Sequence, residues 1–453
     1  MPFGFKTDKE IAKMEIRREI IETLVRWKES HRRKPLIIQG ARQIGKTWVM
    51  KKFGELYYDY VAYFNFETSP ELCREFEHTK DPSRLLGILQ LYSRQPIEPG
   101  RTLLIFDEIQ QSNKALNSLK YFCEQAPGYH VMAAGSLLGV SLSHGDSFPV
   151  GKVEFLRMYP VTFREFIYFD NRQIYDYIDG LASVEEQLPE IVMGSAFESY
   201  RRYLVCGGMP AAVVAMLEGE GVSTVESIQK DILTAYSLDF SKHAPTSDIP
   251  RISAIWNSVP SQLSRENRKF VYKLVKPGAR AREYEDALLW LQQAGLIYRI
   301  FCAKRPGLPI TAYDDVSAFK IYMSDVGLLR AMSGLPAEVL WTEAELYKEF
   351  KGALTENVIL QSLVTQYDPI PRYWTSAGTA EIDFLLQHGM SLIPIEVKSG
   401  ESLNAKSLGV YTKTFRPTLA IRYSMRNLKI DGIVLNLPLF MADWTSRLCA
   451  QLE

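Results

Sequence analysis

Residues 36–50 constrain the fold more than any other segment of the chain. An apolar run, LII, leads into GARQIGKT, which begins at Gly40 and places Lys46 and Thr47 after a second glycine, Gly45. Two glycines let the backbone curl so that several N–H groups point inward, and the helix that follows adds its positive dipole end. The segment therefore predicts a strand, an anion-binding loop and a helix, in that order.

The loop fits the pattern G-x-x-x-x-G-K-[ST], which binds nucleotide phosphates. We expect Lys46 to reach the β and γ phosphates and the Thr47 hydroxyl to bind Mg²⁺. A plain glycine turn with an exposed lysine is the alternative, and the position between strand and helix disfavours it. The expected nucleotide-binding residues are Gly40, Ala41, Arg42, Gln43, Ile44, Gly45, Lys46, Thr47 and Trp48.

A second apolar strand, LLIF, ends in two acidic residues, Asp107 and Glu108. We expect Asp107 to hold Mg²⁺ through water and Glu108 to polarise the attacking water as a general base. Ser136, at the end of the next expected strand, is a candidate for positioning water or the γ-phosphate. Serine at a strand end is also a common helix cap, so this assignment is weaker.

Short apolar strands alternate with helical segments through the first part of the chain. The strands are expected at 35–39, 61–67, 102–108 and 129–136, after a helical pattern over residues 9–31. This alternation predicts a parallel α/β sheet, in which ligands bind at the carboxyl ends of the strands. The candidate polar residues all lie at those ends.

The segments GARQIGKT, LLIFDEIQ, AAGSLLG and FPVGKVEFLRMYPVTFREF resemble the bacterial and archaeal AAA-type ATPases that carry a C-terminal domain of unknown function. The resemblance covers nearly the whole chain. It implies ATP as the nucleotide, Asp107 and Glu108 as Walker B acids, and Ser136 near the sensor position. No single arginine finger stands out; the candidates are Arg42, Arg157, Arg164, Arg280 and Arg282.

A chain of 453 residues is too long for one ordinary core, so we expect several domains. The pattern changes predict an ATPase domain over residues 1–200, a helical, winged-helix-like region over 201–340 and a small α/β domain over 341–453. In the middle region, an amphipathic helix at 282–300 runs into a strand, a charged turn and a second extended piece at 318–325.

Five basic residues precede or begin the candidate recognition helix, and they could contact DNA phosphates. They are Lys269, Lys273, Lys276, Arg280 and Arg282. A solvated helical face between domains explains the same residues equally well.

The third region holds a second acidic cluster. Glu356 falls in an expected helix, Asp383 in an expected strand, and Glu396 and Lys398 in the next strand. Because residues two apart on a strand share a face, Glu396 and Lys398 project together, and Asp383 joins them if the strands pair. Two carboxylates beside a lysine suit Mg²⁺ and the activation of water near a phosphodiester. A surface ion pair of little energetic value is the plain alternative.

The segment GTAEIDFLL…IPIEVKS resembles the PD-(D/E)xK nuclease superfamily, especially its Holliday-junction resolvase branch. The resemblance implies Glu356 as the helical acid, Asp383 as the central acid, and Glu396 and Lys398 as the ExK pair, with Mg²⁺ at Asp383 and Glu396. Ile382 stands where the family pattern has proline.

Composition leaves two functions open. The counts of Lys+Arg and Asp+Glu are both 53, so net charge does not favour nucleic acid or membrane. The scattered cysteines and the lack of a long apolar run lead us to expect a cytoplasmic protein without a membrane partner. One reading is an ATP-dependent DNA-binding or DNA-processing enzyme. The other is a nucleotide-dependent switch that self-associates or binds a protein through an inactive nuclease-like module.

Overall fold

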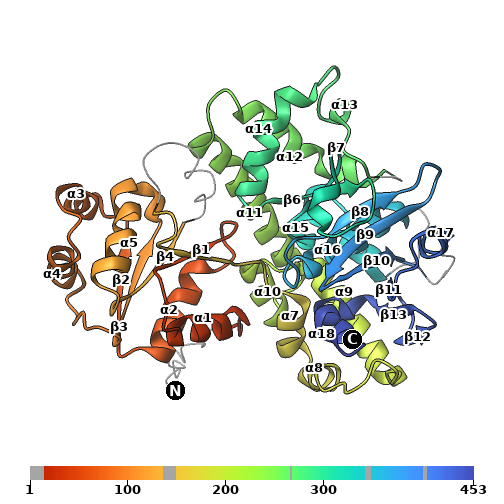
Figure 1. Cartoon of the computed structure of the whole chain (residues 1–453), viewed down its shortest axis with the longest axis horizontal. Helices are drawn as coiled ribbons and strands as arrows, with labels where there is room; N and C mark the ends of the chain where they lie inside the picture. Colours follow the sequence, from red (N-terminus) through yellow and green to blue (C-terminus); the bar gives the residue numbers. More distant parts are fainter. Residues whose placement is uncertain (1–14, 136–148, 266–267, 342–347, 401–405, 453) are drawn as a thin grey trace, which may run out of the picture.

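The computed structural model describes residues 15–135, 149–265, 268–341, 348–400 and 406–452. Two β-sheets organise these residues, one with five strands near the N-terminus and one with eight strands in the second half. Figure 1 shows the first sheet, in orange, set to one side of the green and blue elements.

The N-terminal sheet is fully parallel and has the order β2-β3-β4-β1-β5. Its strands are β1 (Leu36–Gln39), β2 (Tyr60–Asn65), β3 (Thr102–Asp107), β4 (His130–Ala134) and β5 (Glu154–Arg157). The first four lie where the sequence predicts strands, so the expected parallel α/β sheet is confirmed. The alternation of strands and helices did not reveal β5, which adds an edge strand beside β1.

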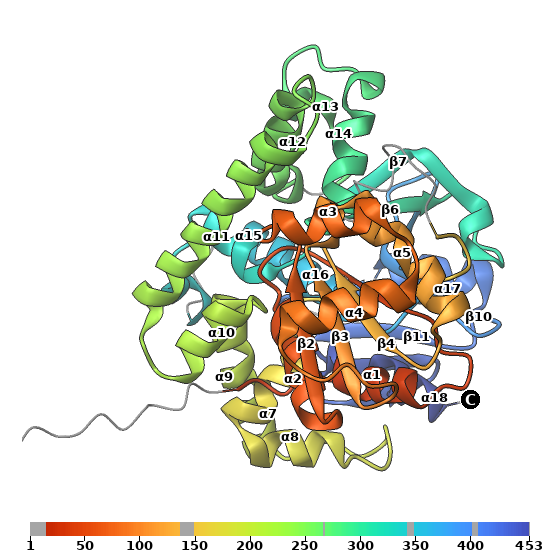
Figure 2. The same cartoon turned by 90° about the vertical axis from the view of Figure 1, so that its left-hand side faces the viewer.

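Helices cover both faces of this sheet because successive side chains of a buried strand point to opposite faces. Ile38 and Ile105 pack with α1 (Ile20–Glu29) and α2 (Lys46–Tyr57). Ile37 and Leu104 pack instead with α3 (Pro70–His78), α4 (Pro82–Ser93) and α5 (Asn113–Gln125). Figure 2 shows α3, α4 and α5 in front of the strands. The N-terminal sheet is therefore packed between helices on both of its faces.

The helix expected over residues 9–31 is shorter in the structure. Residues 9–14 lie outside the described residues, and α1 begins only at Ile20. Residues 15–18 are not helical, because Ile16 and Arg18 turn inward and are buried, each only 6% exposed. Tertiary contacts therefore override the local helical pattern.

A layer of helices follows the first sheet. Its members are α7 (Phe163–Asp170), α8 (Arg172–Asp179), α9 (Glu190–Cys206), α10 (Pro210–Leu217), α11 (Val222–His243), α12 (Ile249–Leu263), α13 (Tyr272–Val275) and α14 (Ala281–Gln293). The sequence predicts that the segment 282–300 begins as a helix and runs through AGLI into a strand, and the structure has this order: α14 ends at Gln293, and Gly295, with a left-handed φ of 74°, starts the turn into a strand.

The second sheet has the order β12-β13-β11-β10-β9-β8-β6-β7. Its strands are β6 (Ile297–Ala303), β7 (Asp314–Met323), β8 (Arg372–Thr375), β9 (Glu381–His388), β10 (Ser391–Val397), β11 (Ala420–Ser424), β12 (Lys429–Asp431) and β13 (Val434–Pro438). The remaining helices are α15 (Val326–Ser333), α16 (Lys348–Leu363), α17 (Lys406–Phe415) and α18 (Thr445–Ala450), with 3₁₀ turns at η1 (Ile109–Gln111), η2 (Ile310–Tyr313), η3 (Ala337–Trp341) and η5 (Leu439–Trp444).

The hairpin β6–β7 belongs to this second sheet. β6 pairs with β7 in antiparallel fashion and with β8 in parallel at Cys302 and Tyr373. The order helix, strand, turn, strand is therefore present, but one edge of the hairpin is joined to the third region. The boundary expected between 340 and 341 consequently divides strands that lie in a single sheet, and the winged-helix assignment stays a prediction.

Among the described residues, no helix combines the length and the apolar character that crossing a lipid bilayer requires.

Candidate nucleotide site and C-terminal carboxylate site

The loop between β1 and α2 has a conformation that requires glycine at both ends. Gly40 has a φ of 150° and Gly45 a φ of 90°. A Cβ atom on Gly40 would lie 2.4 Å from the carbonyl oxygen of Met158, which follows β5. That distance is shorter than any Cβ contact allows, so the residue has to be glycine. The curled loop that the sequence predicts is thus confirmed in its backbone.

Lys46 opens α2 and folds its side chain back over the loop. Its Nζ donates to the carbonyl oxygens of Gly40, at 2.9 Å, and Ala41, at 2.7 Å. Burial lowers the pKa of Lys46 to about 8, although the nearby carboxylates of Glu108 and Asp107 oppose this shift. The ammonium therefore lies inside the loop next to two acids, where an added anion would strengthen its charged form.

Thr47 and Asp107 meet although they are far apart in sequence. The Thr47 hydroxyl donates to Asp107 Oδ2 at 2.7 Å, and the Tyr63 hydroxyl donates to the same oxygen at 2.9 Å. β2 and β3 are parallel neighbours, so Tyr63 and Asp107 emerge at the same edge. A hydroxyl and a carboxylate at this distance are oxygen ligands of the kind Mg²⁺ prefers.

Glu108 follows directly after β3 with a left-handed φ of 51°. Its backbone N–H donates to Asp107 Oδ1 at 3.1 Å, and its Oε2 accepts from Gln110 Nε2 at 2.5 Å. A non-glycine residue in this region of φ is uncommon and costs conformational energy. The turn directs the two acids apart, with Asp107 toward Thr47 and Glu108 toward Gln110.

The middle region contacts the same loop. Arg42 forms an ion pair with Asp239 of α11, and the Tyr236 hydroxyl of α11 donates to the Arg42 carbonyl at 2.9 Å. A Cβ on Gly295, just after α14, would lie 3.1 Å from the backbone nitrogen of Ala41. The phosphate-binding loop is therefore bordered by helices that come some 200 residues later in the chain.

A mostly apolar cavity of about 850 Å³ opens beside the start of α2. Trp48 and Ile16 line it from the N-terminal part, and Pro210 and Val214 line it from α10. Pockets of this size, with apolar walls and few polar groups, are typical of sites for small organic ligands. Trp48, which the sequence places in the nucleotide-binding segment, thus faces a cavity adjacent to the loop.

Arg18 hydrogen-bonds the loop to the segment that follows β5 and to α7. Its Nη1 donates to the Ile44 carbonyl at 3.1 Å, its Nη2 to the Tyr159 carbonyl at 2.7 Å, and its Nε to Glu165 at 3.1 Å. Glu165 also closes a capping box with Thr162 at the start of α7. A side chain from the N-terminal segment thereby fixes the phosphate loop and the helix after β5 together.

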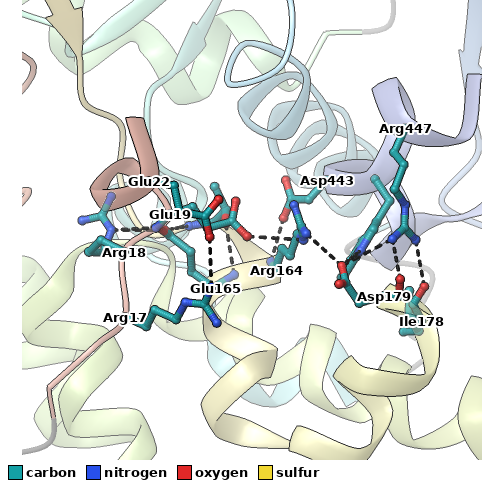
Figure 3. Close-up of polar contacts among 12 residues, drawn as sticks. Arg17, Arg18, Glu19, Glu22, Arg164, Glu165, Ile178, Asp179, Asp443 and Arg447 are labelled. Atoms are coloured by element: carbon teal, nitrogen blue, oxygen red, sulfur yellow. Dashed lines mark hydrogen bonds and ion pairs between the residues drawn. The ribbon is translucent and has the colours of Figure 1, made fainter. Parts of the chain in front are cut away.

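Figure 3 shows how these contacts continue toward the C-terminus. The backbone N–H of Arg164 donates to Asp443 Oδ2 at 2.8 Å, and its Nη2 donates to Asp179 Oδ1 at 2.8 Å. Arg447 of α18 bonds the Ile178 carbonyl at 3.0 Å. This row of polar contacts joins the loop region to the C-terminal helix.

Ser136 lies outside the described residues. Two of the arginine candidates are held by acids, Arg42 by Asp239 and Arg164 by Asp179. The other three, Arg157, Arg280 and Arg282, are exposed. The structure therefore brings Lys46, Thr47, Asp107 and Glu108 together and singles out no arginine.

In the second sheet, three of the four expected residues converge. Asp383 Oδ2 accepts the N–H of Val397 at 2.8 Å, which sets it against β10. Lys398 Nζ lies 2.6 Å from Glu396 Oε1. Burial raises the pKa of Glu396, and Lys398 opposes that shift. The pairing of β9 with β10 brings Asp383 beside the end of β10, and Lys398 follows directly after that strand, so the assignment of these residues to a nuclease site stays a prediction.

The fourth residue, Glu356 of α16, has a different partner. Arg268 forms an ion pair with Glu356 Oε1, and the Tyr322 hydroxyl donates to Oε2 at 3.2 Å. Burial and then repulsion from Asp383 raise the pKa of Glu356 to about 7. Within the described part of the chain, no group of three or more His, Cys, Asp or Glu side chains has the arrangement to hold a metal ion. In this conformation the cluster therefore does not fit a metal held by all three acids.

The five basic residues expected near the candidate recognition helix are all exposed. They lie in and around α13 and at the start of α14. Their exposure fits both a phosphate-binding face and a solvated one, so the DNA assignment stays a prediction.

Sequence reasoning missed several residues of the nucleotide site. Tyr63 had a usable signal, because a residue near the carboxyl end of β2 must lie beside the end of a neighbouring parallel strand. Arg18, Tyr236 and Asp239 had none, since their contacts with the loop depend on how distant segments pack.

Comparison with known proteins divides the chain into three matched segments. Residues 32–167 match a family model described as an AAA domain. Residues 197–339 and 351–440 match two models described as domains of unknown function, DUF8612 and DUF4143. No curated protein matches the chain in sequence.

Solved structures with detectable similarity include three ATPase-type or DNA-associated proteins. A Walker-type ATPase of Pyrococcus abyssi is 14% identical, with a TM-score of 0.45, over 70% of this chain and 96% of that one. The Thermotoga maritima RuvB Holliday junction branch migration motor is 14% identical, with a TM-score of 0.28, over 64% and 90%. The Aeropyrum pernix ORC1 protein in complex with DNA is 12% identical, with a TM-score of 0.27, over 71% and 92%.

The family match and the geometry of the loop agree on the first third of the chain. Its parallel sheet, its glycine loop and the meeting of Thr47 with Asp107 all lie within residues 32–167. Residues 32–167 of this chain thus match an AAA domain in sequence and contain a glycine loop of the P-loop type between β1 and α2.

Proposed function

We propose that the protein binds ATP at Gly40–Trp48, hydrolyses it with Mg²⁺ and couples this reaction to the binding or processing of DNA. The observation that carries the nucleotide part is the convergence of Lys46, Thr47 and Asp107 on one glycine loop. The family match to an AAA domain supports the same reaction.

In the proposed reaction, the loop N–H groups and Lys46 hold the phosphates. Lys46 Nζ now bonds two loop carbonyls, and phosphate oxygens would replace these as acceptors. Because the ammonium is buried, its attraction to the negative charge that develops on the γ-phosphate is weakly screened. The apolar cavity beside Trp48 has room for the base of the nucleotide.

Thr47 and Asp107 are the residues that would hold Mg²⁺, directly or through water. When bound, the cation neutralises charge on the β and γ phosphates. Tyr63 fixes the Asp107 carboxylate by donating to its Oδ2, so this ligand is oriented before the nucleotide arrives.

Glu108 is the proposed general base, and its replacement tests the reaction. Glu108→Gln should retain ATP binding but lower hydrolysis by about 10²-fold or more, because a general base contributes that much. The measurement is phosphate release at saturating ATP, with Asp431→Asn, an exposed acid on β12, as the matched control. Turnover equal to that of the wild type would remove Glu108 from this role.

The DNA part of the proposal rests on the exposed basic residues around α13 and on the carboxylates of the second sheet. If the basic residues contact phosphates, DNA affinity should fall steeply as salt rises. Fluorescence anisotropy of labelled branched and linear DNA at several salt concentrations measures this. An affinity that does not depend on salt would contradict phosphate binding.

A second function has one specific observation in its favour. Glu356 is paired with Arg268, and no three-carboxylate metal group forms among the residues that the structure describes. A nuclease-like module in this state would serve as a docking surface, and the protein would then act as a nucleotide-dependent switch. Divalent-metal-dependent cleavage of DNA that is lost in Lys398→Ala would exclude this alternative.

A further inference from the structure

Arg268, in the connection between α12 and α13, places its guanidinium inside the C-terminal carboxylate site. Its Nη1 pairs with Glu356 Oε1, and the two side chains are only 13% and 6% exposed. A Cβ built on Gly352 would lie 3.4 Å from Arg268 Nη2 and 3.8 Å from Ser399 Oγ. The guanidinium therefore lies between α16 and the residues that directly follow β10.

Several contacts hold this arginine in position. Its Nε donates to the Leu263 carbonyl at 3.2 Å, and two residues further on the N–H of Phe270 donates to the Phe319 carbonyl of β7 at 2.8 Å. Arg268 has a left-handed φ of 47°, which costs conformational energy in a residue with a side chain. The contacts, above all the ion pair with Glu356, compensate for that cost.

Charges around the guanidinium do not balance. Burial disfavours its charged form, yet Glu356, Tyr322, Asp383 and Glu381 together raise the pKa of Arg268. Glu381 already has Lys320 as an ion-pair partner. Glu356, Asp383 and Glu396 remain, and the ion pairs that the described residues form with them come from Arg268 and Lys398.

One oxygen of this cluster has no partner. Glu396 is 4% exposed, and its Oε1 pairs with Lys398 at 2.6 Å, while no residue within the described ranges donates a hydrogen bond of normal geometry to its Oε2. A buried carboxylate oxygen without a donor is unfavourable unless the site receives a further positive group. The cluster thus has capacity for a cation, and Arg268 occupies its Glu356 side.

We propose that Arg268 is a built-in cation that, through its pair with Glu356, keeps a divalent metal ion from the neighbouring acids Asp383 and Glu396. This inference rests on the proposed processing of DNA by the carboxylates of the second sheet and adds a form of regulation to it. While the guanidinium pairs with Glu356, that acid is not available as a ligand, and the positive charge repels a divalent ion nearby. The middle region, which supplies Arg268, also contacts the phosphate loop through Asp239. It therefore touches both sites.

Mn²⁺ binding to the full chain, measured by isothermal titration calorimetry without nucleotide or DNA, tests the proposal. Arg268→Gln should bind Mn²⁺ at least about tenfold more tightly than the wild type, because the competing charge is gone. Arg265→Gln, an exposed arginine in the same connection, is the matched control and should bind like the wild type. Adding Asp383→Asn to Arg268→Gln should abolish the gain.

Arg268→Gln leaves Glu356 buried without its partner, which can impair folding. The double variant Arg268→Gln/Glu356→Gln avoids this problem and keeps Asp383 and Glu396 as ligands, so it should also bind Mn²⁺ more tightly than the wild type. Circular dichroism verifies the fold of each variant.

The outcomes separate the two proposals. One outcome is that the wild type and both Arg268 variants bind Mn²⁺ equally and that Asp383→Asn removes this binding. That result would leave the metal site intact and overturn competition by Arg268. No Mn²⁺ binding in any variant would overturn the metal site itself and the competition with it. Tighter Mn²⁺ binding in the two Arg268 variants, but not in Arg265→Gln, supports both the metal site and the competition by Arg268.

Discussion

The phosphate loop and the C-terminal carboxylate site both bring a lysine beside two acids, yet the lysines are held differently. Lys46 bonds two carbonyls of its own loop, and Asp107 receives hydroxyls from Thr47 and Tyr63. Lys398 instead pairs directly with Glu396, while Glu356 is paired with an arginine from another region. In the first site neutral groups hold the charges where a ligand can replace them; in the second, charges neutralise each other.

Because both sites are buried, this difference in partners becomes a difference in the free energy of ligand binding. A buried lysine bonded to carbonyls gains when an anion arrives, because its own charge lacks a full partner. A buried ion pair has already recovered part of its desolvation cost and loses that gain when a ligand displaces one member. The loop is therefore prepared for a ligand, whereas the carboxylate site has to give up the pair between Arg268 and Glu356 first.

The largest effect that distinguishes the sites should come from their glycines. Gly40→Ala should destabilise the protein by about 3 kcal/mol or more and abolish nucleotide binding, because the new Cβ would overlap Met158 at a strained φ. Gly352→Ala, where the nearest atom is the end of the Arg268 side chain, should be tolerated. Chemical denaturation measures both.

Gly87→Ala is the matched control for these glycines. It lies in α4 with nothing within 4 Å of the added Cβ, so it should be neutral or stabilise by up to about 1 kcal/mol. A Gly40→Ala variant as stable as this control would show that the loop backbone is not constrained as described.

A smaller effect concerns the charge of Lys46. Its pKa of about 8 in the empty loop means that fewer molecules carry the ammonium as pH rises. Phosphates favour the charged form, so ATP binding should take up a proton, and affinity should fall about tenfold between about pH 7 and about pH 9. Calorimetry in buffers of different ionisation enthalpy measures the proton uptake.

Lys46→Arg keeps its charge over this range, so any ATP affinity it retains should not depend on the lysine titration. A wild-type affinity that stays constant over the same pH range would contradict a buried lysine with a lowered pKa.

The smallest effect concerns Glu356. Its pKa in the folded protein, about 7, lies above that of an unfolded glutamate, so the protonated form favours folding. That contribution to stability is fully present below the unfolded pKa and is lost as pH rises toward about 7. Glu356→Gln should therefore remove the part of the decline in stability over this range that comes from the titration of Glu356.

Urea denaturation at several pH values measures this effect, with Glu338→Gln, an exposed acid, as the control. The same decline in wild type and Glu356→Gln would contradict a raised pKa at that position.

The two sites also differ in how far the sequence predicted them. The spacing from Gly40 to Thr47 is local, and Asp107 could be placed beside it because parallel strands end at one edge. Asp383, Glu396 and Lys398 could likewise be placed from strand periodicity. Even the parallel sheet follows from local alternation, although the short edge strand β5, whose residues are half-buried or exposed, gave too weak a signal.

Contacts between distant segments could not be predicted. Arg18 and Glu165 are 147 positions apart, and Arg268 and Glu356 are 88 apart, so no local pattern links them. Residues 15–18 are not helical for the same reason, since Arg18 and Glu19 are held by contacts with Glu165 of α7. In both sites the local chemistry was predictable, and what surrounds it depends on packing.

The most direct test of this account is ATP binding by wild type and Lys46→Ala, measured by calorimetry at neutral pH with Lys120→Ala, an exposed lysine, as control. The account predicts that Lys46→Ala weakens ATP binding by about 100-fold or more, because contacts between the ammonium and the phosphates are lost, while Lys120→Ala binds like the wild type. An unchanged ATP affinity in a folded Lys46→Ala variant would contradict the assignment of the glycine loop as the nucleotide site.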